Sequence, residues 1–148
     1  MSYVLSFFMK VVIDTNIWIS ALISKDGSSR DIIRLALQGY ISPQISASLF
    51  LEYESVMKRA KIQHLCALSL QEQEELFYAF LSTCNWNEIF YLWRPNLKDE
   101  DDNFLVELAV ASNSRVIISE NKKDFESSKL IFDFEVLTAK EFLERMQK

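Results

Sequence analysis

The chain has 148 residues, of which 49% are hydrophobic, and this size predicts one compact domain over residues 1–148. Its net charge of −5 argues against a broad basic surface, so a polyanionic partner would need a local basic path or a carboxylate cluster loaded with divalent cations. Two cysteines without CxxC spacing and a lone His64 argue against a disulfide framework, a zinc site and a Cys–His nucleophile pair.

The first residues, MSYVLSFFMK, form a short apolar run without a basic n-region or a small-residue cleavage site. They are typical of an extension of the first strand, or of residues ahead of a natural start near Met9, rather than of a signal peptide. No apolar run reaches the ~18 residues that a transmembrane helix needs. We therefore expect a cytoplasmic protein without membrane contact.

The first half of the chain predicts a buried strand followed by helices. Residues 10–13 form a β-branched run without alternation, which is typical of a strand buried on both faces of a parallel sheet. Residues 28–37 and 46–59 show apolar positions at helical spacing behind serines that can cap, and 40–41 is a very short strand candidate between them. A capping box, SLQE, predicts a helix over residues 69–84.

The second half continues the alternation of strands and helices. Residues 116–119 form the second clear strand, and 89–92 and 134–137 are weaker candidates. The helix predicted over residues 102–111 is apolar nearly all round, which indicates that it lies inside the fold. A second capping box, TAKE from Thr138, precedes a C-terminal helix. This order favours an α/β sandwich with a mostly parallel central sheet.

Polar side chains follow the two clearest strands. Asp14 and Asn16 come directly after the first strand, and Ser119, Asn121 and Asp124 come at and after the end of the second. Ligands of an open parallel sheet bind outside the carboxyl ends of its strands, so these residues are candidates for one site. The same residue types are common in turns and helix caps, and that alternative stays open at both places.

Carboxylates also precede one predicted helix and lie within another. The acidic run 99–102 comes before the buried helix, where one acid is enough for a cap and the others repel each other unless a cation lies among them. Glu52 and Glu54 lie about equally far from the apolar stripe of their helix, so periodicity does not decide which of them faces a site. A solvated surface remains the alternative for all of these acids.

Taken together, these positions place oxygen ligands after two strands, before a buried helix and on a second helix, as a carboxylate site for Mg²⁺ or Mn²⁺ requires. Four segments then carry a resemblance to a known family: DTN at 14–16, Glu52 with VMKR at 56–59, DEDDN running into LVELA over 99–109, and ISENKKDF at 118–125. In this order they resemble the PIN-domain nucleases, and most nearly the VapC-like toxins of toxin–antitoxin systems.

The resemblance implies a PIN-like three-layer α/β/α sandwich and a Mg²⁺- or Mn²⁺-dependent endoribonuclease. It also implies an RNA substrate, an antitoxin protein as partner and a homodimer. The family glutamate precedes an apolar pair by four residues, which selects Glu52 over Glu54. The catalytic residues that carry over are Asp14, Glu52, Asp102 and Asn121, the first three of them as metal ligands, and the supporting residues are Asn16, Asp99, Ser119 and Asp124.

One segment departs from the family pattern. The family's Thr-Gly-Asp corresponds to Ser119-Glu120-Asn121 in this sequence, with Asp124 three residues further on. An asparagine offers a carbonyl oxygen but neither a negative charge nor a base, which puts a second metal site in doubt. The departure motivates an alternative function, a catalytically impaired PIN-like module that binds RNA or a protein.

Two further expectations concern the rest of the surface and a competing enzyme class. An aspartyl-phosphate enzyme or receiver domain also places an Asp at a strand end, but Asn16 breaks the DxD pair of the phosphatases and no acidic pair adjoins Asp14. For a nucleic-acid substrate, the candidate contacts to the phosphate backbone are Lys58, Arg59, Lys61, Lys122 and Lys123.

Overall fold

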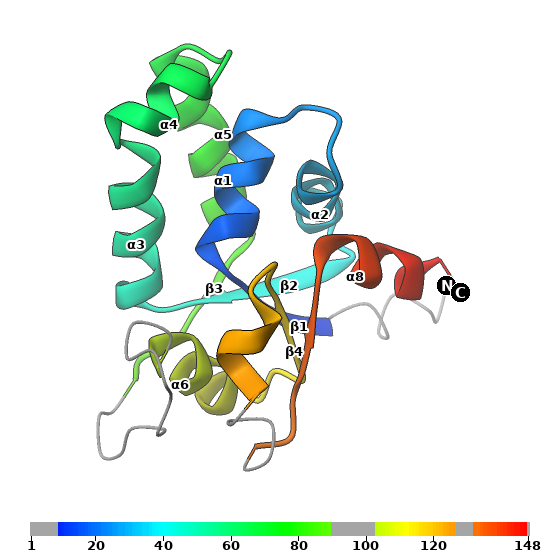
Figure 1. The fold of residues 1–148 in the computed structure, drawn as a ribbon. Helices are drawn as coiled ribbons and strands as arrows, with labels where there is room; N and C mark the ends of the chain where they lie inside the picture. The colour runs from blue at the N-terminus through cyan, green and yellow to red at the C-terminus, as the bar shows by residue number, and fades with distance from the viewer. Residues whose placement is uncertain (1–8, 90–102, 127–131, 148) are drawn as a thin grey trace.

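The computed structural model describes residues 9–89, 103–126 and 132–147. At its centre lies a parallel sheet of five strands in the order β3-β2-β1-β4-β5 (Figure 1). The strands are β1 Met9–Ile13, β2 Ile41–Ile45, β3 Asn85–Trp86, β4 Val116–Ile118 and β5 Glu135–Leu137. The expected parallel sheet is therefore present.

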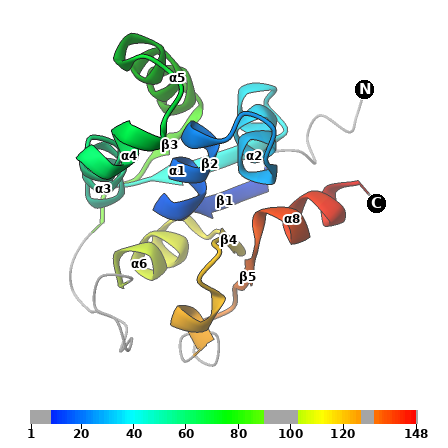
Figure 2. The ribbon, with the colours of Figure 1, turned by 45° about the horizontal axis from the view of Figure 1, so that its top comes forward.

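Helices cover both faces of this sheet (Figures 1 and 2). One face carries α1, α2, α3 and α8, with α4 and α5 beside them, and α6 covers the other. The three-layer sandwich expected from the resemblance is confirmed. The helices are α1 Thr15–Ile23, α2 Ser28–Leu37, α3 Ala47–Met57, α4 Ala60–Leu65, α5 Leu70–Thr83, α6 Asn103–Ser112, α8 Ala139–Met146, and a 3₁₀ helix η3 Lys122–Phe125.

A continuous apolar core joins the sheet to the helices above it. The last three residues of β1 and all three residues of β4 are buried, as their β-branched runs predict. Trp18 of α1 stacks on Phe80 of α5 with ring centroids 5.2 Å apart, and aromatic pairs of this kind contribute roughly 0.5–1.5 kcal/mol beyond their buried area. The hydroxyl of Tyr53 donates a hydrogen bond to the Ile13 carbonyl and so fixes α3 against the end of β1.

Most of the predicted elements appear where the sequence places them. Both capping boxes form: the Ser69 and Thr138 hydroxyls accept N–H groups three residues on, and the glutamates there bond back. The strand expected at 40–41 begins at Ile41 and runs to Ile45. No helix in the described part of the chain is long and apolar enough to cross a bilayer.

The strand expected at 89–92 is wrong for Ile89, which lies outside any strand, while residues 90–92 lie outside the described part. The edge strand is instead the two-residue β3, which begins four residues earlier. Its position depends on the buried amide of Gln44, whose Oε1 accepts hydrogen bonds from Asn85 at 2.9 Å and Asn87 at 3.0 Å. A strand held by side-chain amides has no apolar pattern to predict it.

Candidate active site

Asp14 lies where β1 ends and α1 begins. Its backbone N–H donates to the Ile118 carbonyl over 2.9 Å, which extends the β1–β4 pairing by one residue, and its own carbonyl accepts the Ile17 N–H. Asp14 thus occupies the N-cap position, but its side chain makes no capping hydrogen bond. The carboxylate is left for other contacts, and Asn16 does not cap the helix, because α1 already begins at Thr15.

The strand order explains why this spot collects polar residues. From β1 the chain moves outward to β2 and β3 on one side and then returns to β4 on the other side of β1. The connections after neighbouring strands therefore diverge at the carboxyl ends of β1 and β4, and such a switch point is where parallel α/β sheets bind their ligands. Asp14 follows β1 here, and Ser119 follows β4.

Two side chains donate hydrogen bonds to the same oxygen of Asp14. The Ser119 hydroxyl lies 2.6 Å from Oδ2 and the Asn16 Nδ2 lies 3.2 Å from it. Asn16 is held in turn, because its Oδ1 accepts the Glu120 N–H at 3.3 Å. The hydroxyl of Ser119, which is fully buried, also accepts the Asn121 N–H at 3.0 Å. The loops after β1 and β4 are therefore joined into one polar network around the Asp14 carboxylate.

The electrostatics of the site favour a positive charge. Burial raises the pKa of Asp14 above its ordinary value, hydrogen bonds from the Ser119 side chain and the Thr15 backbone lower that pKa, and the charges of Glu52 and Asp124 raise it again. Mutual repulsion among buried carboxylates is relieved when a cation lies between them. These oxygen donors match the ligand preference of Mg²⁺ and Mn²⁺.

A cavity of about 460 Å³ opens in front of Asp14. Its walls come from α1, α3, the segment after β4 and η3, and its lining residues are Asp14, Thr15, Asn16, Ile19, Ser20, Glu52, Val56, Arg59, Asn121 and Asp124. Five of the eight residues predicted for the site thus face one cavity, and a sixth, Ser119, is bonded to Asp14 directly behind it.

The structure distinguishes between the two glutamates of α3. Glu52 lines the cavity, and its charge acts on Asp14. Glu54 instead lies 3.7 Å from Lys58, with which it forms an exposed ion pair. Glu52 takes this position because the adjacent Tyr53 is buried and bonded to β1, which sets the rotation of the helix.

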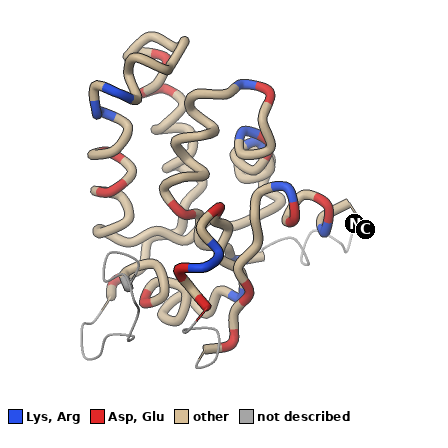
Figure 3. The backbone as a smooth tube through the Cα atoms, in the orientation of Figure 1, with Lys and Arg blue, Asp and Glu red and all other residues tan. Residues whose placement is uncertain are grey.

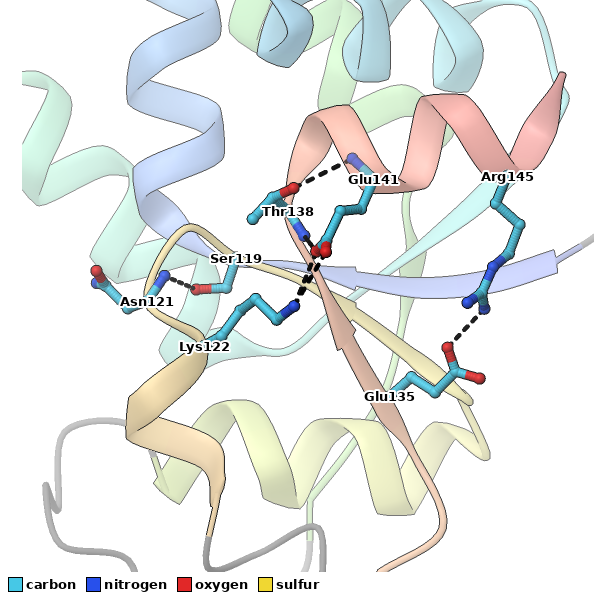
Figure 4. A network of polar contacts seen from close by, with 7 residues as sticks. All are labelled: Ser119, Asn121, Lys122, Glu135, Thr138, Glu141 and Arg145. Carbon is cyan, nitrogen blue, oxygen red and sulfur yellow. Dashed lines mark hydrogen bonds and ion pairs between the residues drawn. The ribbon is translucent and has the colours of Figure 1, made fainter.

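The segment after β4 is held in place by an ion pair with α8. The Lys122 ammonium contacts both carboxylate oxygens of Glu141 at 3.0 and 3.1 Å, and one of these oxygens also accepts the Thr138 N–H (Figure 4). The side chain of Asn121 points away from this pair (Figure 4). Lys122 is therefore engaged with α8, which makes it a poor candidate for the contact to a phosphate backbone predicted from the sequence.

Two predicted site residues, Asp99 and Asp102, lie outside the described residues. Within residues 9–89, 103–126 and 132–147, no group of three or more His, Cys, Asp or Glu side chains is arranged to hold a metal ion. Sequence reasoning missed Ile19, Ser20 and Val56, which line the cavity. A signal for them existed, because they follow Asn16 and Glu52 by three or four residues on the same helical faces.

Three comparisons with known proteins bear on the site. A family model described as "PIN domain" matches residues 10–123, which is most of the chain. A search among curated proteins gave no match. Among solved structures, the chain is similar to one in a crystal structure of VapBC2 from Rickettsia felis bound to a DNA fragment from their promoter. That likeness has a TM-score of 0.56 and 18% identity over 88% of this chain and 98% of the other, so it concerns the fold alone.

Proposed function

Because this chain belongs to the PIN-domain family, whose members are generally nucleases, we propose that it is an endoribonuclease that hydrolyses RNA phosphodiester bonds with Mg²⁺ or Mn²⁺. The observation that carries the proposal is the cavity at the sheet's switch point, which Asp14, Glu52 and Asp124 line together with Asn16 and Asn121. Oxygen donors of this kind suit a hard divalent cation and leave room for a phosphate.

The proposed metal ligands are Asp14, Glu52 and Asp102, the last from the resemblance alone. When bound, the cation lowers the pKa of water and stabilises the charge that develops on the phosphate. Ser119 and Asn16 fix the orientation of the Asp14 carboxylate through hydrogen bonds to its Oδ2. Pre-set geometry of this kind means that little rearrangement is needed when charge builds up in the transition state.

The segment after β4 has a smaller role in this proposal. Asn121 presents an amide rather than a carboxylate, so it can orient water or phosphate but cannot remove a proton. Asp124 lies beside it, and its charge acts on Asp14, so it supplies some of the negative charge that the family pattern leads one to expect at position 121. We assign Asp124 a supporting role on this basis.

The proposed biological setting is a toxin–antitoxin pair. It is supported by the VapC-like order of the sequence motifs and by the shared fold with a chain of the VapBC2 complex. An antitoxin protein and a second copy of the chain are the proposed partners. A single sheet and one continuous core in the described residues support treating residues 1–148 as one domain.

The alternative, a binding module that has lost catalysis, is favoured by one observation: Asn121 lines the cavity in place of an acid. The two functions differ in whether the acidic site binds metal. Titration of the intact protein with Mn²⁺, followed by calorimetry, is expected to show saturable binding that Asp14→Asn weakens. Absence of any binding would favour the binding module.

The nuclease itself is tested by Mn²⁺-dependent cleavage of labelled RNA. We expect Asp14→Asn and Glu52→Gln each to reduce the rate by 100-fold or more, on the order of what a lost charge-stabilising group costs. Glu54→Gln is the matched control, because the same change is made two residues away on a side chain that pairs with Lys58 instead. Full activity in Asp14→Asn, or equal losses in the two glutamine variants, would refute the assignment.

A further inference from the structure

Arg59 contributes the positive charge among the residues that line the cavity. The other charged lining residues are Asp14, Glu52 and Asp124, all of them acidic. Arg59 lies at the turn between α3 and α4, as the residue directly before α4. The cavity therefore carries charges of both signs, from three carboxylates and one guanidinium.

Arg59 lies beyond the end of the helix that carries Glu52. Glu52 and Val56 are four residues apart and share one face of α3, and Arg59 lines the same cavity from the turn into α4. Glu52 lies five residues before Met57, the last residue of α3, which at 1.5 Å per residue is about 7.5 Å along the axis, and Arg59 follows beyond that end. Figure 3 shows basic positions at the α3–α4 turn and acidic positions further along α3.

The two adjacent cations at this turn differ in their ion-pair contacts. Lys58 pairs with Glu54 on the outer side of α3. For Arg59 the contacts are backbone bonds that begin α4, and no carboxylate in the described part of the chain lies within ion-pair distance of its guanidinium. Because Arg59 lines the cavity and has no acidic partner among the described residues, its guanidinium is available to a ligand.

The ligand chemistry follows from the guanidinium. Its planar fork binds phosphate oxygens through two parallel hydrogen bonds, and its charge does not depend on pH. Arg59 follows the end of α3, whereas Glu52 lies within that helix, so a strand held at the acidic residues and running along α3 would bring a neighbouring phosphate to the guanidinium. The position suits the phosphate of a neighbouring nucleotide, reached by a strand that passes along α3.

We propose that Arg59 binds a phosphate next to the scissile one and thereby aligns a single-stranded substrate in the cavity in front of Asp14. This inference rests on the proposed nuclease function. The contact positions the strand and carries no base information, since phosphates are common to all sequences. It also gives an acidic protein the local attraction for a polyanion that its net charge of −5 lacks.

The test compares Arg59→Ala with Lys58→Ala, a matched change of the adjacent cation. Binding of fluorescein-labelled oligouridylate is measured by anisotropy at several salt concentrations, with Ca²⁺ present because it binds the same oxygen donors. We expect Arg59→Ala to weaken binding roughly fivefold and to reduce the slope of log K against log salt by about 0.7, the value for one phosphate on a single strand. Lys58→Ala should change both quantities less.

Three further readouts separate the possible outcomes. The loss should be equal for oligothymidylate and for other base sequences, Arg59→Lys should restore part of the affinity, and in cleavage assays Arg59→Ala should raise KM while leaving kcat. Equal effects of Arg59→Ala and Lys58→Ala, a loss confined to RNA, or no binding by the wild type would overturn the proposal. If the wild type binds with this Arg59 dependence and does not cleave, the contact stands and the nuclease function falls.

Discussion

Replacing Ser119 with alanine removes the hydrogen bond that orients Asp14, together with the one that the hydroxyl accepts from the Asn121 N–H. The Ser119 hydroxyl is fully buried and donates to the Asp14 carboxylate over 2.6 Å. A hydrogen bond to a charged group contributes roughly 1.5–3 kcal/mol, and solvent does not replace it at a buried position. We therefore expect Ser119→Ala to lower the free energy of unfolding by about 2–3 kcal/mol at neutral pH in the metal-free protein.

The pKa of Asp14 gives this loss a pH dependence. Burial raises that pKa and the Ser119 hydrogen bond lowers it, so in the variant the folded-state pKa is higher still. The contribution of the Ser119 hydroxyl to the free energy of unfolding is complete above the folded-state pKa of Asp14 in both proteins, where the carboxylate is ionised. As the pH falls through that pKa, the contribution shrinks towards the roughly 1 kcal/mol of a neutral hydrogen bond. Urea unfolding of both proteins at neutral pH and near pH 4 measures the difference.

Ser112→Ala is the control for this experiment. Ser112 is also buried, but its hydroxyl bonds to neutral partners, the Leu108 carbonyl at 2.7 Å and the Ser114 hydroxyl at 2.7 Å. Its removal should cost about 1 kcal/mol at both pH values. Equal losses for the two serines, or a Ser119 loss that does not change with pH, would refute the view that Ser119 acts on an ionised Asp14.

Three other changes test the site and its supports. Asp14→Asn should raise the unfolding temperature in EDTA at neutral pH. The fold raises the pKa of Asp14, so the stability of the fold with a protonated Asp14 is lost as the pH rises through that pKa, and asparagine avoids this loss. An unchanged or lower unfolding temperature in calorimetry would contradict this. Tyr53→Phe should destabilise the fold by about 1–3 kcal/mol in urea, through the unpaired Ile13 carbonyl, whereas Tyr78→Phe on the surface should not. Glu141→Gln should reduce thermal stability at neutral pH and approach the wild type in acid, because a backbone hydrogen bond lowers the pKa of Glu141 in the fold; a constant gap would contradict this.

Several features of the fold were readable from local sequence because the physics behind them is local. The β-branched runs that become β1 and β4 predict buried strands, and the two capping boxes fix the starts of α5 and α8. The strand β3 was not readable, because its position depends on the Gln44 amide, 41 residues away from Asn85. The resemblance supplied the family, which the match over residues 10–123 confirms.

For the site, the sequence by itself determined which residue types follow the strands, namely Asp14 and Asn16 after one and Asn121 and Asp124 after another. Only the tertiary structure decided that these residues face one cavity, because the order β2-β1-β4 brings together strand ends that are far apart in the sequence. The hydrogen bond between Ser119 and Asp14, for example, joins residues 105 positions apart. The rotation of α3 was likewise decided by a tertiary contact: the hydrogen bond of the buried Tyr53 hydroxyl to the Ile13 carbonyl of β1 directs the helix face with Glu52 and Val56 towards the cavity. Helical periodicity fixes the spacing of side chains on a helix, and packing against the sheet fixes where they point.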